Sequence, residues 1–94
     1  MDVFYTARAQ QAIEHIANFV ESKNTIGSGK RFALKFESAI NKYANENVEF
    51  AKCNNEILSM LGYSCITIND WVVAFKIKKN KFIVYRIVWG GLLK

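Results

Sequence analysis

The chain has 94 residues, 51% of them hydrophobic, and no proline. This length and composition predict a single globular domain over residues 1–94 and exclude a disordered chain. No apolar run approaches the roughly 20 residues that a membrane-spanning helix needs. The 13 Lys and Arg residues outnumber the 8 Asp and Glu, and the net charge of +5 favours an anionic partner such as nucleic acid, the ribosome or an acidic protein segment.

The first half of the chain predicts one strand followed by two helices. Residues 3–6 are rich in β-forming side chains, and Thr6 can cap a following helix. Apolar side chains recur at helical spacing over residues 7–22, and a second stripe with this spacing follows the break at Gly27-Ser28-Gly29. Two helices joined by a short polar link predict an antiparallel helical hairpin.

The last third of the chain predicts three strands. Residues 63–68, 71–77 and 82–89 are dominated by β-branched and aromatic side chains, and polar turns at 69–70 and 78–81 separate them. Residues 57–61 fit either a helical turn or the approach to a strand. The order β-α-α-β-β-β predicts an α+β fold, in which the helical hairpin packs on an antiparallel three- to four-stranded sheet that includes the opening strand.

Motifs for catalysis or metal binding are scarce. Gly27-Ser28-Gly29-Lys30 resembles the end of a phosphate-binding loop, but the earlier glycine and the preceding strand are missing, so it is interpreted as a helix connection. His15 is predicted to be a solvated helix residue. No cluster has metal-ligand spacing, so neither a metal nor a cofactor is expected. Because no CxxC motif or export signal is present, Cys53 and Cys65 are expected to be reduced thiols.

Basic side chains gather around the last predicted hairpin. Two of them share a strand face and two more lie in the adjoining turn, so together they predict a cationic tip for phosphates or an acidic partner, although a solvated turn explains them equally. The candidate target- or nucleic-acid-binding residues are Lys76, Lys78, Lys79, Lys81 and Arg86.

Arg86 is the one charge in an otherwise apolar strand. Burying it without a partner would cost several kcal/mol, roughly. Arg86 is therefore expected either on an open sheet face near Lys76, in a functional role, or against a carboxylate such as Asp70 or Glu56, in a structural one.

Three stretches carry a resemblance to a known family. They are VFYTxxA at residues 3–9, which runs into the first helix, and WVVAFKI at 71–77 followed by FIVYRIV at 82–88. In these stretches, in length and in element order, the chain resembles the RelE/ParE superfamily of bacterial toxins from type II toxin–antitoxin, or plasmid stabilisation, modules. The resemblance implies an antiparallel sheet with a helical hairpin on one side. It also implies a cytoplasmic bacterial protein that a cognate antitoxin holds inactive.

The resemblance implies one of two activities. RelE-like members cut messenger RNA on the ribosome, which requires a base, an acid and a cation at the phosphate. Residues 63–75 contain no Lys, Arg or His, and residues 90–93 are Gly and Leu, so Arg86 and Tyr85 are the catalytic candidates that remain. ParE-like members instead inhibit DNA gyrase by binding and need no catalytic group.

The missing groups favour a ParE-like toxin that acts by binding. One alternative is a ribosome-dependent endoribonuclease that uses Arg86, Tyr85 and lysines such as Lys76. Another is a non-toxic adaptor that has the same fold and binds nucleic acid or protein. Whether the protein is an enzyme, which target and antitoxin it binds, and whether it forms a homodimer stay open at this stage.

Overall fold

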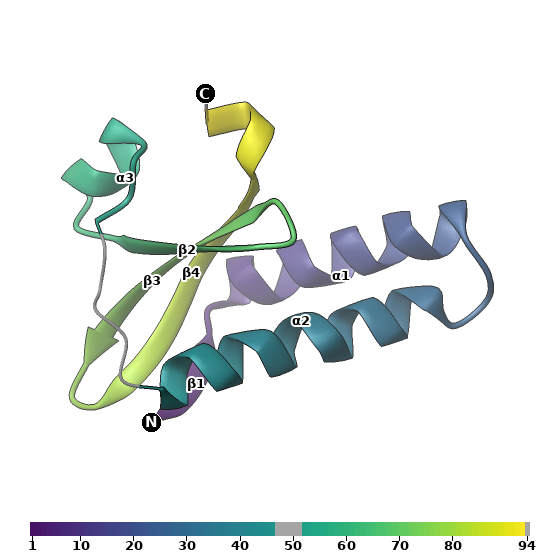
Figure 1. The fold of residues 1–94 in the computed structure, drawn as a ribbon, viewed down its shortest axis with the longest axis horizontal. Helices are drawn as coiled ribbons and strands as arrows, with labels where there is room; N and C mark the ends of the chain where they lie inside the picture. The colour runs from purple at the N-terminus through teal and green to yellow at the C-terminus, as the bar shows by residue number, and fades with distance from the viewer. Residues whose placement is uncertain (47–51, 94) are drawn as a thin grey trace.

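The computed structural model describes residues 1–46 and 52–93. Its elements are β1 (Asp2–Tyr5), α1 (Ala7–Lys23), α2 (Ser28–Asn45), α3 (Glu56–Met60), β2 (Ser64–Ile68), β3 (Trp71–Lys78), β4 (Lys81–Trp89) and a 3-10 helix, η1 (Gly90–Leu93). The predicted elements are confirmed to within one or two residues, and residues 57–61 take the helical alternative. The long helices α1 and α2 form a hairpin beside the sheet (Figure 1).

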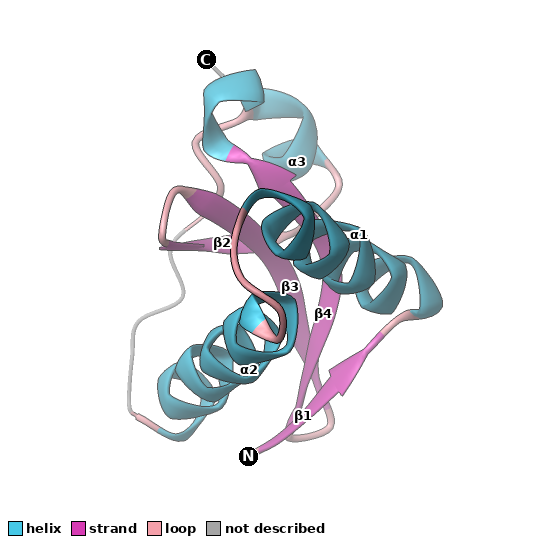
Figure 2. Cartoon of the chain, turned by 90° about the vertical axis from the view of Figure 1, so that its right-hand side faces the viewer, coloured by secondary structure: helices cyan, strands magenta, loops and turns pink. Residues whose placement is uncertain are grey.

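The sheet has the strand order β1-β4-β3-β2. The pairs β2–β3 and β3–β4 are antiparallel, but β1 runs parallel to β4. The fold is therefore α+β with two helices packed on a four-stranded mixed sheet (Figure 2), and the expectation of an entirely antiparallel sheet was wrong. Tight turns force neighbouring strands to be antiparallel, whereas the long connection between β1 and β4 allows parallel pairing.

Two-residue turns set the register of the three antiparallel strands. Asn69 and Asp70 join β2 to β3, and Lys79 and Asn80 join β3 to β4; all four have positive φ, between 47° and 70°. Positive φ at both central residues is the type I′ geometry, whose twist matches that of a hairpin. Each turn therefore fixes the register of the strand residues next to it, and β3 and β4 keep this register as far as the pair Phe75–Val84.

The starts of the two long helices are satisfied by side chains. Thr6 caps α1, as predicted, because its hydroxyl oxygen accepts a hydrogen bond from the Ala9 N–H at 3.2 Å. At the start of α2, the Glu21 carboxylate accepts hydrogen bonds from the N–H groups of Gly27 (2.7 Å) and Gly29 (2.8 Å). These glycine N–H groups are the donors that a phosphate-binding loop would offer, so Gly27–Lys30 is a helix connection, as interpreted from the sequence.

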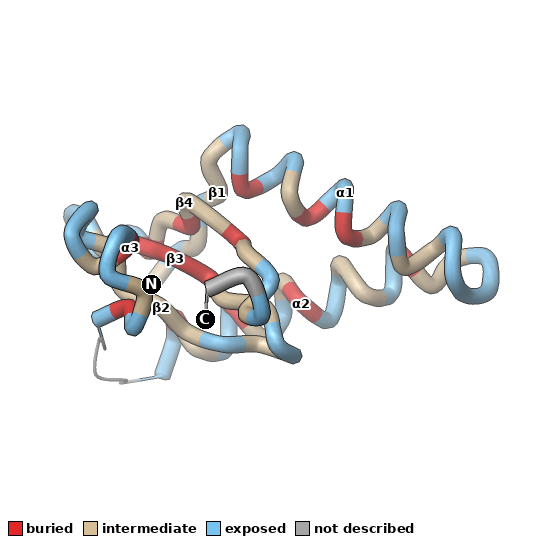
Figure 3. The backbone as a smooth tube through the Cα atoms, turned by 90° about the horizontal axis from the view of Figure 1, so that it is seen from above, coloured by how far each residue is buried: buried red, intermediate tan, exposed pale blue. Residues whose placement is uncertain are grey.

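The core lies between the hairpin and one face of the sheet, where buried positions recur along α1, α2 and the central strands (Figure 3). The cluster consists of Ala9, Ile13, Ile16, Phe36, Ile40, Ala44, Val73, Phe75, Phe82, Val84 and Ile87. The opposite face of the sheet takes no part in this cluster. In the described part of the chain, no helix is long and apolar enough to cross a membrane.

A disulfide joins Cys53 to Cys65, so the expectation of two reduced thiols was wrong. Residues 52–63 fold back beside β2, where Lys52 forms an isolated bridge with Ser64. This fold brings the two cysteine Cα atoms to 4.8 Å, which is within the range for a disulfide. A separation of 12 residues in the sequence does not reveal that approach.

Candidate binding face

The sheet face opposite α1 and α2 is shaped by a bulge in β4. Ala74 pairs with Arg86, but the next residue, Phe75, pairs with Val84, so Tyr85 is an extra residue in the strand. Val84 and Ile87 both belong to the core on the helix side. The two residues between them, Tyr85 and Arg86, therefore both face away from the helices.

Alternation along the strands brings further cationic and aromatic side chains to this side. Lys76 lies between the core residues Phe75 and Ile77, so it faces away from the helices, and Lys78 follows it two positions later. On β4, Lys81 precedes the buried Phe82 and faces the same way. We call this surface the cationic face and define it by Phe4, Tyr63, Lys76, Lys78, Lys81, Tyr85 and Arg86.

Two tyrosine rings hold the lysines at the centre of the cationic face. The Tyr63 and Tyr85 ring centroids are 5.4 Å apart, and the Lys76 Nζ lies 5.0 Å from the first and 5.6 Å from the second. The Lys78 Nζ lies 6.0 Å from the Tyr85 ring. Cation–π contacts of this kind contribute about 0.5–1 kcal/mol each at exposed sites. Among the described residues no carboxylate forms an ion pair with these lysines, so their charge is available to an anion.

A cavity of about 290 Å³ opens beside Lys76, lined by Gly62, Ser64, Phe75, Lys76, Ile77 and Lys78. It forms where β2 begins, because Ser64 pairs with Phe75 and β3 continues beyond that pair. Gly62, two residues before β2, has a φ of 83°, a backbone conformation that favours glycine. Among the described residues, the cavity therefore lies beside the part of the β3 edge that extends beyond its pairing with β2, and two lysines contribute to its lining.

The cationic face extends across β4 to β1. Phe4, between the helix-facing Val3 and Tyr5, points to the same side as Ile83, its register partner. The Lys81 Nζ lies 5.3 Å from the Phe4 ring. Asp2 stands opposite Lys81 in the register and brings one carboxylate to this edge.

The structure brings together most of the residues that the sequence singled out. Lys76, Lys78, Lys81, Tyr85 and Arg86 share the cationic face. The other predicted residue, Lys79, lies in the turn at the end of the hairpin and outside this face. Within residues 1–46 and 52–93, no carboxylate forms an ion pair with Arg86, so the structural role proposed with Asp70 or Glu56 is not found.

Sequence reasoning missed two members of the face, Tyr63 and Phe4. Phe4 could have been found from strand parity, because it lies between Val3 and Tyr5 and so points to the opposite side of the strand from both. Tyr63 could not, because its ring contacts depend on how residues 52–63 fold back. The signal for that fold was the cysteine pair.

No general base was identified on the cationic face. His15 lies on α1 and lines a separate apolar groove of about 510 Å³ with Ile16, Phe19, Trp71 and Trp89, on the helix side of the sheet. Burial raises the pKa of Tyr5 to about 12, with a further contribution from the negative charge of Glu37, but this phenol also lies on the helix side. In the described part of the chain no group of His, Cys, Asp or Glu could hold a metal ion. The face is thus suited to binding anions and flat rings.

The sequence matches no protein-family model and no curated protein. What bears on function is therefore the geometry of the cationic face together with the sequence patterns at residues 3–9, 71–77 and 82–88.

Proposed function

We propose that this protein is the toxin-like component of a bacterial type II toxin–antitoxin, or plasmid stabilisation, module, and that it acts in the cytoplasm by binding its target through the cationic face. The observation that carries the proposal is the gathering of Lys76, Lys78 and Arg86 with Tyr63 and Tyr85 on the sheet face that α1 and α2 leave open. The element order and the RelE/ParE-like patterns at residues 3–9, 71–77 and 82–88 support it.

Binding is favoured over catalysis because proton transfer requires a base near the substrate. The described residues of the cationic face include neither a histidine nor a carboxylate, and Asp2 lies beside the face at the β1 edge. The leading target is DNA gyrase, bound in the ParE-like manner, and a cognate antitoxin is expected to neutralise the protein.

Ribosome-dependent cleavage of messenger RNA is the second candidate function. The bulge supports it, because Tyr85 and Arg86 are adjacent on one face and Lys76 is beside the Tyr85 ring at 5.6 Å. Tyrosine rings and cations together suit single-stranded RNA, whose bases stack on aromatic side chains.

Induced expression in bacteria tests the proposal and separates the targets. Filamentation with DNA damage is the result expected for gyrase, and rapid translation arrest with cleaved transcripts is the result expected for the ribonuclease. Normal growth, with the full-length protein present and folded, would contradict a toxin.

A charge-matched pair of variants tests the cationic face itself. The double variant Lys76→Ala/Lys78→Ala removes two charges at the centre of the face and should abolish toxicity. Lys30→Ala/Lys35→Ala removes two charges from exposed positions of α2 and should keep it. Lys30→Ala/Lys35→Ala should melt close to the unmodified protein, since surface substitutions usually change stability by about 0.5 kcal/mol or less. Lys76→Ala/Lys78→Ala also removes three cation–π contacts and should melt lower, by about 1–3 kcal/mol in stability, so toxicity is compared per folded molecule. Equal loss of toxicity in both variants would mean that net charge, and not this face, carries the activity.

A further inference from the structure

The Cys53–Cys65 disulfide ties residues 52–63 to the sheet beside the cationic face. We propose that thiol–disulfide exchange at this bond regulates the face: the oxidised form fixes Tyr63 against Lys76 and Tyr85, and the reduced form releases it and weakens target binding. The proposal rests on the proposed function, since it names the regulation of the same surface.

Cys65 lies in the same row of the sheet as Arg86. It pairs with Ala74 across β2 and β3, and Ala74 pairs with Arg86 across β3 and β4. Ala74 has no exposed surface, although it faces away from α1 and α2. The side of the sheet on which Cys65 and Arg86 lie is therefore shielded from solvent at Ala74, next to the disulfide.

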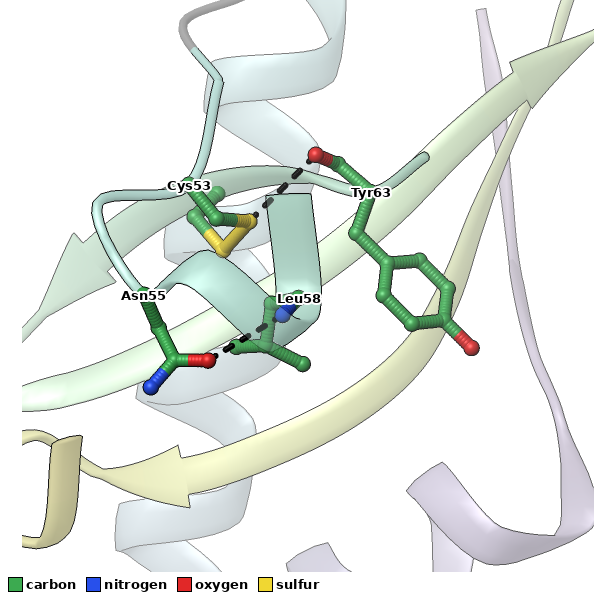
Figure 4. Close-up of a disulfide and its surroundings, with 5 residues drawn as sticks. Cys53, Asn55, Leu58 and Tyr63 are labelled. Carbon is green, nitrogen blue, oxygen red and sulfur yellow. Dashed lines mark hydrogen bonds between the residues drawn. A yellow bond between two sulfur atoms is a disulfide. The ribbon is translucent and has the colours of Figure 1, made fainter. Parts of the chain in front are cut away.

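In the described part of the chain, the disulfide is the one covalent link between residues 52–63 and the sheet, and noncovalent contacts supplement it. Within the segment, the five-residue α3 is capped by Asn55, whose side-chain oxygen accepts from the Leu58 N–H (Figure 4). The Tyr63 N–H donates to the Leu58 carbonyl. Toward the rest of the protein, Leu58 is buried and Lys52 bridges Ser64. A helix this short is not stable by itself, so the covalent bond is a large part of what fixes the segment.

Tyr63 connects the segment to the binding residues. Its ring centroid lies 5.0 Å from the Lys76 Nζ, closer than the Tyr85 ring centroid at 5.6 Å. The neighbouring residues Gly62 and Ser64 line the cavity beside Lys76. Releasing residues 52–63 would thus remove a ring from Lys76 and open the cavity wall. A binding surface that must be ordered when its target arrives binds more weakly.

Reduction of the disulfide consumes two molecules of a small thiol, the class of reductant found in the cytoplasm. The first attacks, as a thiolate, the Sγ of Cys65, which is the less buried of the two cysteines. The disulfide breaks, its electron pair leaves on the Cys53 Sγ, and that sulfur takes up a proton. The second thiol then attacks the small-molecule sulfur of the mixed disulfide and releases the Cys65 thiol. Two small thiols are oxidised to one disulfide while the protein is reduced.

Reduction changes the character of one contact within residues 52–63. The Cys53 Sγ lies 3.4 Å from the Tyr63 carbonyl oxygen (Figure 4). A disulfide sulfur carries no proton, so this contact becomes an S–H···O hydrogen bond only after reduction, and a weak one. Because cytoplasmic disulfides are usually transient and redox-sensing, a cysteine pair of this kind suits a protein that acts there.

Hydrogen exchange on the full-length protein, oxidised or reduced with dithiothreitol, tests the proposal. After reduction, the amides of Leu58 and Tyr63 should exchange at least about tenfold faster. A disulfide that closes a loop of this length changes the equilibrium constant between folded and unfolded states by on the order of a hundredfold. The amides of α1 and β4 should keep their protection. Unchanged exchange at residues 58 and 63 would overturn the proposal. Equal acceleration in α1 and β4 would also overturn it, because the disulfide would then be a general stabiliser.

Reactivity of lysines toward an amine-acylating reagent tests the coupling to the face. Reduction should speed the modification of Lys76 and leave that of Lys30, on α2, unchanged. The Cys53→Ser variant should match the reduced protein and should not respond to dithiothreitol. Equal Lys76 rates in the two redox states would refute the coupling.

These measurements require no toxicity, so the two proposals fail separately. If the protein is not toxic but releases residues 52–63 on reduction, the proposed function is contradicted and the redox regulation is supported. If the protein is toxic but neither the hydrogen exchange nor the rate of Lys76 acylation responds to reduction, the proposed function is supported and the redox regulation is contradicted.

Discussion

Gly29 is the point of closest approach between α1 and α2, and its replacement by alanine tests how the helical hairpin is packed. A Cβ atom at this position would lie 2.3 Å from the Ala17 carbonyl oxygen and 3.0 Å from its carbon. Both are backbone atoms of α1, so no side-chain rotation relieves the contact. The added methyl group would also lie 3.1 Å from the Glu21 carboxylate oxygen that accepts from the Gly29 N–H.

The cost follows from how far the helices must move. An ordinary contact requires at least 3.4 Å, so α1 and α2 would have to separate locally by about 1 Å. Overpacking of this kind costs about 1–3 kcal/mol. Alanine is the better helix former by up to about 1 kcal/mol, which offsets part of the cost. The net expectation for Gly29→Ala is a loss of about 1–2 kcal/mol, or roughly 5–15 °C in melting temperature for a domain of this size.

Thermal and urea unfolding, followed by far-UV circular dichroism, measure this loss. Lys30→Ala is the matched control, because it replaces the next residue of the same helix at an exposed position and should stay within about 0.5 kcal/mol of the unmodified protein. If Gly29→Ala is as stable as the control, or more stable, helix propensity outweighs the contact and the close approach to Ala17 is not a constraint on the hairpin.

Three further substitutions test other features of the fold. Tyr5→Phe removes a buried hydroxyl that has no hydrogen-bond partner and should raise stability by about 1 kcal/mol. Because burial raises the pKa of Tyr5 from 10.0 to about 12, the unmodified protein should lose stability between pH 10 and 12, and urea unfolding at pH 9 and 11 should show a smaller loss for Tyr5→Phe. Hydrogen bonds from the N–H groups of Gly27 and Gly29 lower the pKa of Glu21 below 4.5, so its stabilisation is present above that pH and is lost as the pH falls through the lowered pKa. Glu21→Gln should therefore melt lower at pH 7 and depend less on pH between 5 and 2; an unchanged acid dependence would contradict this. Lys79, at a φ of 50°, should gain about 1 kcal/mol on replacement by Asn, and toxicity should not change because Lys79 lies outside the cationic face.

The elements with strong periodicity could be predicted from the sequence. The order of the elements, and their bounds to within one or two residues, follow from the apolar stripes of α1 and α2 and the β-branched runs of β2, β3 and β4. Burial of one face makes apolar residues recur with the period of the helix or strand. The same rule placed Lys76 and Lys78 together on one side of β3. Local hydrogen bonding also predicted the Thr6 cap, since a hydroxyl at that position has a nearby N–H to accept from.

Contacts between segments distant in the sequence could not be predicted. The parallel pairing of β1 with β4 depends on the path of the intervening helices, and no turn residue encodes it. The pairing of Cys53 with Cys65 depends on residues 52–63 folding back beside β2. Tyr63 joined the candidate site only through that fold, so the missed disulfide and the missed binding residue have one cause.

The placement of Arg86 shows how a single extra residue in a strand can create a binding surface. With strict alternation from the buried Val84, Arg86 would point into the core below α1 and α2, where an unpaired guanidinium would cost several kcal/mol, roughly. The bulge at Tyr85 removes this conflict, because it returns Ile87 to the core and turns both intervening residues outward. Arg86, the one charge in an apolar stretch of sequence, is thus a half-buried cation next to Tyr85 on the sheet face opposite α1 and α2. A bulge that is required for burying Ile87 cannot be lost without unfolding part of the core, so the same packing that stabilises the fold also holds Tyr85 and Arg86 in place for a target.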